Sequence, residues 1–348
     1  MQTSRLFDSA RVAAAITISL IIAIGIISLV SKEPLLALSY FLRGPVYSLA
    51  HIGNVIEMAI PLSFAGLSCA ILFKSNLFNL GAEGLFFSSA LLSAMLASQL
   101  PLPHVVSPLF ITLCGGILGG LLGCIPCVLY LKWRTNMFVV SIMMNNILYG
   151  ICMYLLNQNR DLTAYAIVSP PFLQSAKLAK LIPGTRIHWG LVILIVCCVF
   201  LTWFISKTKW GYEIRMMGIN QHFARYSGMS IAGVMFLVHA LAGFVAGVGG
   251  SVEILGMYNK FQWTVLPGYG LDGALVALLA RSNPAMVPLA AVFLAYIRIG
   301  ADMMSRMSDV SAEMVSIVQS VIILLISSQL LLQGLKNRVL LKEAKADE

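Results

Sequence analysis

Long runs of apolar residues recur from one end of this 348-residue chain to the other. Many reach about 18 residues, the length that a helix needs to cross a lipid bilayer. Hydrophobic residues make up 59% of the chain and charged residues only 11%, which is too apolar for a soluble domain. A β-barrel would instead alternate apolar and polar residues in segments of about ten. The sequence therefore predicts an all-α polytopic membrane protein.

We expect about ten transmembrane helices. The first run, from Val12 to Val30, is too long for the core of a signal peptide, so we expect a retained helix. The eighth run, 270–280, is too short to cross alone, so it either extends outward through 263–269 or is a broken helix. The expected spans are residues 12–30, 46–73, 78–100, 106–130, 136–157, 189–206, 231–256, 270–280, 285–301 and 313–333.

The formal net charge of +9 comes from basic residues scattered among the loops, so it does not indicate a nucleic-acid partner. Lys132–Arg134 and Lys207–Lys209 lie beside span ends, and the positive-inside rule then puts both termini in the cytoplasm. We expect one permease domain over 1–335. Its expected parts are halves of about 1–157 and 189–335, an outer loop 158–188, a cytoplasmic segment 207–230 and a cytoplasmic tail 336–348.

Two short strings place an acid between glycines at the start of a long apolar run: Gly81–Gly84, with Glu83, and Gly270–Gly273, with Asp272. Each string opens the third span of its half. Five spans per half would insert the second half upside down, as an inverted-topology repeat. The first string would then face the cytoplasm and the second the outside. An acid at membrane depth indicates a functional site, although helix-dipole stabilisation and close glycine packing explain both strings as well.

Other polar residues within the spans are candidates for the translocation pathway. Glu57, the deepest acid in the chain, shares a helix face with Asn54. Asn145 and Asn146 are adjacent and cannot share one face, so at least one should meet a neighbouring helix, where interhelical hydrogen bonding is the simpler role. The pathway or gating candidates are Asn54, Glu57, Asn79, Glu83, Asn145, Asn146 and Asp272.

The segment 207–230 is long, amphipathic and interrupted by Gly211, Gly218 and Gly228. The glycines predict two short helices joined at an angle. One interpretation is an interfacial helix on anionic lipid. The other is a docking surface for a partner.

Three segments resemble one family of membrane proteins: Gly211–Asn220 followed by Ala224–Gly228, Phe78–Gly84, and Pro267–Pro284. They are similar to permease subunits of ATP-binding-cassette (ABC) importers of the ribose/branched-chain amino acid class. The match favours the longer permease of the simple-sugar and nucleoside branch, with a type II importer fold. The resemblance implies that 207–230 couples to the ATPase through Gly211, Glu213, Arg215, Gly218, Asn220, Arg225 and Gly228.

The resemblance also implies partners. These are two cytoplasmic ATPase subunits or one fused double ATPase, a second related permease in a heterodimer, and an extracytoplasmic solute-binding lipoprotein. The location would be the bacterial inner membrane.

The chain itself carries no G-x-x-x-x-G-K-[ST] phosphate loop, so we expect no enzymatic activity of its own and no cofactor. The five histidines form no metal-ligand pattern, and the cysteines lie in apolar runs, where packing is their simplest role.

A proton-coupled secondary transporter is the rival from another class, because it too uses buried acids and inverted repeats. The scarcity of intramembrane basic residues favours a neutral solute. We expect a nucleoside, with a riboflavin-like heterocycle or a simple sugar as alternatives.

Overall fold

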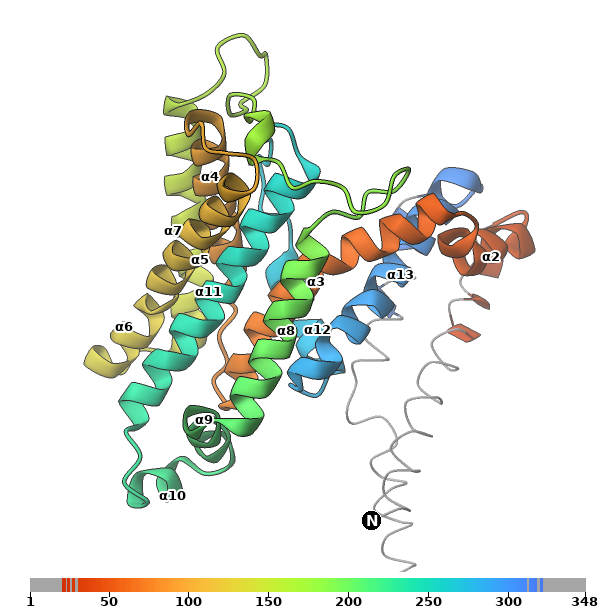
Figure 1. The fold of residues 1–348 in the computed structure, drawn as a ribbon. Helices are drawn as coiled ribbons and strands as arrows, with labels where there is room; N and C mark the ends of the chain where they lie inside the picture. The colour runs from red at the N-terminus through yellow and green to blue at the C-terminus, as the bar shows by residue number, and fades with distance from the viewer. Residues whose placement is uncertain are drawn as a thin grey trace, which may run out of the picture. The chain divides into compact units, whose positions relative to one another are not determined.

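The computed structural model describes residues 31–311 without a break, together with 21–22, 24–25, 27–28, 313–317 and 320–321. The expected spans 12–30 and 313–333 lie largely outside these residues, and the tail 336–348 lies wholly outside them. Apart from one isolated bridge between Lys180 and His188, the described residues form helices, turns and loops (Figure 1).

The helices are α2 (Pro34–Arg43), α3 (Leu49–Lys74), α4 (Ala82–Gln99), α5 (Val106–Gly123), α6 (Ile125–Trp133), α7 (Met137–Gln158), α8 (Gly190–Lys207), α9 (Lys209–Ile219), α10 (Gln221–Tyr226), α11 (Ile231–Met257), α12 (Tyr269–Leu279) and α13 (Val287–Met307). Three single 3₁₀ turns cover Gly44–Val46, Gln174–Ala176 and Pro284–Met286.

Six segments within the described residues are long and apolar enough to cross a membrane: Leu49–Lys74, Val106–Trp133, Met137–Gln158, Gly190–Lys207, Ile231–Met257 and Pro284–Met307. Each matches an expected span. The other two spans that we expected in this part of the chain are α4 and α12, which fall short of these criteria. Helix α12 has only 11 residues, as expected if the eighth span is a broken helix. The protein is therefore a multi-pass helical membrane protein.

The chain divides into two compact units, Gly53–Ala295 on one side and Met1–Ile52 with Tyr296–Glu348 on the other. In the second of these, α2 was not expected from the sequence. Pro34 starts it, where the missing N–H costs nothing. Gly300 of α13 lies so close that an added Cβ would be 2.4 Å from the carbonyl oxygen of Phe41. Ser31 Oγ donates a hydrogen bond to Asp309 Oδ1 over 2.6 Å, which fixes the entry into α2.

Helix α11 is the centre of the unit Gly53–Ala295 and packs along α4 and α5 (Figure 1). Glycines permit this packing: an added Cβ at Gly119 of α5 would lie 2.3 Å from the Gly243 oxygen, and one at Gly247 would lie 2.3 Å from the Gly115 oxygen. Membrane helices gain little from the hydrophobic effect, so close backbone contact between small residues is what holds them together. The α5–α11 contact therefore fixes the position of α11 against α5.

Candidate translocation and coupling sites

The two acid-and-glycine strings lie against each other. The backbone N–H of Gly268, the residue before α12, donates to Glu83 Oε1 over 2.6 Å. An added Cβ at Gly270 would lie 2.5 Å from Glu83 Cβ. Glu83 is the second residue of α4, so α4 and α12 begin at the same place in the fold. The two strings therefore meet within the fold, and the side of the membrane from which each helix enters stays a prediction.

Glu83 and Asp272 each lie in the first turn of their helices and are buried, 9% and 6% exposed. The carboxylate of Glu83 accepts its hydrogen bond from the N-terminus of α12, not from that of its own helix α4. Negative charge is stabilised where helix N-termini present unbonded N–H groups. The arrangement ties the start of α12 to the start of α4 through one charge-assisted hydrogen bond.

Two of the predicted asparagines hold the chain where α4 begins. Asn79 Oδ1 accepts from Gly81 N over 2.7 Å. Asn145 of α7 accepts from Gly84 N over 2.9 Å and donates to the Leu80 oxygen over 2.9 Å. Both side chains are buried and satisfy backbone groups that the helix start would leave unpaired. In this structure their contacts are with the backbone at the start of α4.

Asn146 points the other way from Asn145. It is exposed on α7, and its Nδ2 donates to the Ile142 oxygen one turn earlier, over 3.3 Å. Ile147 and Ile151 are exposed on the same helix. An amide on an otherwise apolar, uncovered face of a membrane helix is costly in lipid.

Asn54 and Glu57 are half-buried near the start of α3. The loop 158–188 lies over this end of the helix, since an added Cβ at Gly53 would lie 2.9 Å from Thr185 Cβ. The charges of Glu57 and Arg186 interact. Asn54 and Glu57 therefore lie beside the loop, and Glu57 interacts with a basic residue of it rather than with Glu83.

Glu253 of α11 is an acid that sequence analysis missed. It is 2% exposed, its Oε1 accepts from Tyr269 Oη over a long 3.4 Å, and its Oε2 has no hydrogen-bond partner among the described residues. The criterion that singled out Glu57, an acid inside an apolar run, applies equally to Glu253 within 231–256. That signal could have found it.

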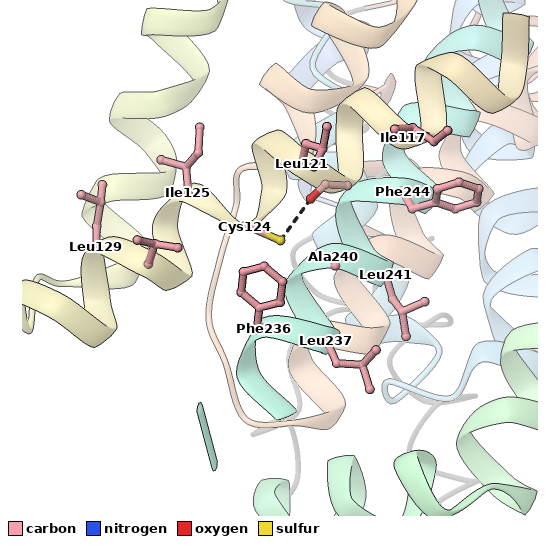
Figure 2. Close-up of a pocket in the computed structure, with 12 residues that line it drawn as sticks. Ile117, Leu121, Cys124, Ile125, Leu129, Phe236, Leu237, Ala240, Leu241 and Phe244 are labelled. Carbon is pink, nitrogen blue, oxygen red and sulfur yellow. Dashed lines mark hydrogen bonds between the residues drawn. The ribbon is translucent and has the colours of Figure 1, made fainter. Parts of the chain in front are cut away.

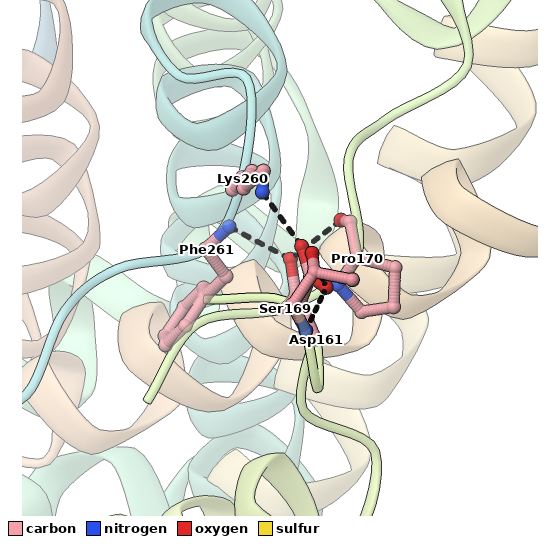
Figure 3. A network of polar contacts seen from close by, with 6 residues as sticks. Asp161, Ser169, Pro170, Lys260 and Phe261 are labelled. Atoms are coloured by element: carbon pink, nitrogen blue, oxygen red, sulfur yellow. Dashed lines mark hydrogen bonds and ion pairs between the residues drawn. The ribbon is translucent and has the colours of Figure 1, made fainter. Parts of the chain in front are cut away.

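The loop 158–188 is fixed to the segment that follows α11 (Figure 3). Lys260 Nζ lies 2.7 Å from Asp161 Oδ2, and Ser169 and Phe261 exchange two hydrogen bonds, of 3.0 and 2.9 Å. The hydrogen bond from Lys260 and those from Thr163 lower the pKa of Asp161 to about 2. Because this pKa is lowered, the ion pair stays formed above it and is lost only as the pH falls towards about 2.

The segment 207–230 contains two short helices, as predicted, but the break between α9 and α10 is not at a glycine. Asn220 makes the break with extended backbone angles, and its side chain caps α10 by accepting from Phe223 N over 3.0 Å. Gly211 and Gly218 lie inside α9, so our expectation that these glycines interrupt the helix is wrong. Gly228, with φ of +79°, ends the segment in the left-handed conformation that favours glycine.

The glycines of α9 allow close packing on the ends of other helices. An added Cβ at Gly211 would lie 2.3 Å from the Phe204 oxygen of α8, and one at Gly218 would lie 2.1 Å from the Lys74 oxygen at the end of α3. Arg215 donates to the Ile205 oxygen. Helix α9 is thus held against α3 and α8.

Helices α9 and α10 also carry large exposed apolar side chains. Ile219 is 78% exposed, Phe223 52% and Tyr226 90%. Arg225 is exposed beside them, while Glu213 is half-buried. We call Ile219, Phe223 and Tyr226 the apolar edge. Such a cluster at a helix end marks an interaction surface for protein or membrane.

A groove of about 630 Å³ lies between α5, α6 and α11 (Figure 2). Its lining is apolar, and the polar group in it is the Cys124 thiol, which donates to the Gly120 oxygen over 3.2 Å. A hydrogen-bonding solute would find no further partner there. The pathway candidates lie elsewhere in the fold.

Residues 51–327 match the family described as the branched-chain amino acid transport system permease component. This match covers well over half of the chain. The chain belongs to this permease family. It is a translocation subunit of an ABC importer, and the hydrolysis of ATP is the task of a partner ATPase.

Named relatives support the assignment. The chain is 31% identical to the guanosine ABC transporter permease of Bacillus subtilis, over 82% of each chain. It is 30% identical to the glucose ABC transporter permease of Haloferax volcanii, over 90% of this chain and 86% of the relative. It is 27% identical to the nucleoside ABC transporter permease of Lactococcus lactis, over 85% and 82%.

Replacing Glu83 with alanine is expected to leave the N–H of Gly268 without its acceptor in a buried place, at a cost of about 1–3 kcal/mol. The detergent-solubilised permease should melt at a lower temperature, and uptake should fall. Glu83→Gln retains an acceptor oxygen and should recover much of the melting temperature. Equal melting temperatures for wild type and Glu83→Ala would show that this bond does not hold the two helices.

Proposed function

We propose that this permease imports a neutral, hydrogen-bonding solute, and that the solute is a nucleoside. The observation that carries the proposal is that the buried charged side chains are acidic. Glu83, Glu253 and Asp272 are buried, whereas no lysine or arginine within the described ranges is. An anionic solute would meet repulsion from these three acids, against which the span of α13 offers the half-buried Arg298.

Two relatives, a guanosine permease and a nucleoside permease, support a nucleoside as the solute. The glucose relative makes a simple sugar the second candidate. A riboflavin-like heterocycle shares the flat ring and the neutral charge, and it is the third.

The decisive experiment is identification of the ligand that co-purifies with the cognate solute-binding protein. We expect a nucleoside. A tightly bound sugar phosphate or amino acid would contradict the neutral-solute proposal, and glucose would contradict the nucleoside alone.

We propose ten spans in two inverted halves, with Asn54, Glu57, Asn79, Glu83, Asn145, Asn146 and Asp272 along or beside the pathway. The convergence of α4 and α12 supports this topology. Interrupted helices whose N-termini meet inside the protein are typical of inverted-repeat transporters, and they mark the region through which the solute passes.

We propose that α9 and α10 dock on the ATPase, as two subunits or one fused double ATPase. The apolar edge supplies a surface that a protein groove can cover. Helix α9 contacts the ends of α3 and α8, so movement of the ATPase would be transmitted directly to two membrane helices.

We propose that a second, related permease covers the exposed face of α7. Asn146 supports this, since a partner helix can give its amide a hydrogen bond that lipid cannot. An arrangement of two permeases around one pathway would also bring Asn146 to the interface.

We propose that the solute-binding lipoprotein docks on the outer loop. Arg160, Lys180 and Arg186 are exposed on it, while its acid Asp161 is neutralised by Lys260. An exposed basic surface favours a partner with an acidic rim.

The proposed topology, in the inner membrane with cytoplasmic termini, predicts which positions react with a membrane-impermeant thiol reagent. Leu162→Cys in the outer loop, where the native side chain is 85% exposed, should react in intact cells. Ser227→Cys, after α10, should react only once the membrane is permeabilised, because it lies on the ATPase side. The reverse pattern would place the coupling segment on the wrong side of the membrane.

A further inference from the structure

Glu253 lies beside a cluster of aromatic rings that takes no part in the proposed coupling to the ATPase. Tyr269, which donates to its Oε1, has its ring 5.0 Å from that of Phe86 and 6.5 Å from that of Trp263. The ring of Tyr258 lies 5.6 Å from that of Trp263. All of these residues belong to the unit Gly53–Ala295.

The carboxyl of Glu253 is under-satisfied for a group with this degree of burial. Oε1 has one long hydrogen bond, and Oε2 has no partner among the described residues. A buried acceptor without a donor is uncommon and costs free energy, so it calls for a ligand or another explanation. Oε2 of Glu253 therefore keeps hydrogen-bonding capacity that the described residues do not use.

The surrounding rings offer flat apolar surface, and they are not sealed off. Tyr258, Trp263 and Tyr269 are each partly exposed, unlike Phe87 and Phe261 behind them, which are fully buried. Flat heterocyclic bases stack on aromatic rings of this kind whichever base is present, because every base has a π-face.

We propose that Glu253 with Tyr258, Trp263 and Tyr269 forms a nucleobase-binding site on the import pathway. The base stacks on the partly exposed rings, and N–H groups on its edge donate to the Glu253 carboxyl. This inference rests on the proposed nucleoside function and names the part of the nucleoside that is recognised. A carboxylate suits guanine, which presents two adjacent N–H donors, better than adenine, which presents an acceptor at the same position.

The test measures uptake of radiolabelled guanosine and adenosine by the complete importer in proteoliposomes. We expect wild type to favour guanosine. Glu253→Gln places an amide donor opposite the base and should cut guanosine uptake by at least about tenfold, with a smaller change for adenosine, so that the guanosine-to-adenosine ratio falls.

Trp263→Leu is the second variant, because its site is partly exposed and tolerates change more readily than Glu253. Loss of the ring should reduce uptake of both nucleosides by about tenfold, and Trp263→Phe should recover part of it. Asp302→Asn, in an exposed pair with Arg306, is the matched acid-to-amide control and should leave both rates unchanged.

An unchanged ratio in Glu253→Gln, with wild type carrying nucleosides, would overturn this inference and leave the proposed function standing. Normal uptake by Trp263→Leu would overturn the stacking role. A wild-type importer that accumulates glucose and no nucleoside would contradict the proposed function, and the nucleobase site with it.

Discussion

Gly218→Ala is expected to reduce ATP-driven uptake by at least about tenfold while the permease still inserts in the membrane. The new methyl carbon would lie 2.1 Å from the Lys74 oxygen, which is backbone at the end of α3 and cannot turn aside. Overpacking of this kind costs about 1–3 kcal/mol, and about 1.4 kcal/mol corresponds to a tenfold change in an equilibrium. Helix α9 should therefore move off α3 and lose its connection to that membrane helix, while Gly211 and Arg215 still hold it to α8. Uptake in proteoliposomes measures the effect.

Gly25→Ala is the matched control for this substitution, because an added Cβ there meets nothing within 4 Å and Gly25 lies in none of the proposed sites. It should transport like wild type. The amount of ATPase that co-purifies with Gly218→Ala should stay close to normal, since the side chains of the apolar edge are exposed rather than packed on α3. Normal uptake by Gly218→Ala would contradict the proposal that α9 transmits movement to α3.

Gly119→Ala is expected to lower the stability of the whole unit Gly53–Ala295. Its Cβ would lie 2.3 Å from the Gly243 oxygen and 2.9 Å from Gly247 Cα, so α5 and α11 must separate. The cost of about 1–3 kcal/mol, or more against rigid backbone, is a large share of a typical total stability of about 5–15 kcal/mol. We expect a marked fall in the melting temperature and in the yield of monodisperse protein.

Gly150→Ala is the same exchange at an open position, where it is expected to raise stability instead of lowering it. Alanine in an open helical position removes the entropic cost of glycine, about 0.5–1 kcal/mol. Its melting temperature should equal or exceed that of wild type. A melting temperature for Gly119→Ala as high as that of Gly150→Ala would show that the α5–α11 contact does not depend on the missing side chain.

The positions of the long helices could be predicted because hydropathy and length alone decide which segments can cross a bilayer. Helices α3, α7, α8 and α11 begin and end within a few residues of the expected spans. The late start of α4, at Ala82 instead of residue 78, depends on Asn79 and on Asn145 from another helix. Hydropathy carries no information on such partners.

The meeting of the two acid-and-glycine strings could not be predicted for a similar reason. Their equivalence was visible in the sequence, and it suggested opposite faces. Contact between Glu83 and Gly268 depends on how far each broken helix reaches inward, which tertiary packing decides. Likewise, a glycine indicates either a break or a close approach, and only the neighbouring Lys74 and Phe204 oxygens show that α9 uses its glycines for approach.

Uptake in proteoliposomes that contain the permease pair, the ATPase and the binding protein tests the central proposal most directly. With ATP on the ATPase side, labelled nucleoside should accumulate against its gradient, and a proton gradient alone should drive none. Accumulation driven by a proton gradient in vesicles that contain this permease without any ATPase would contradict the proposal and favour a secondary transporter.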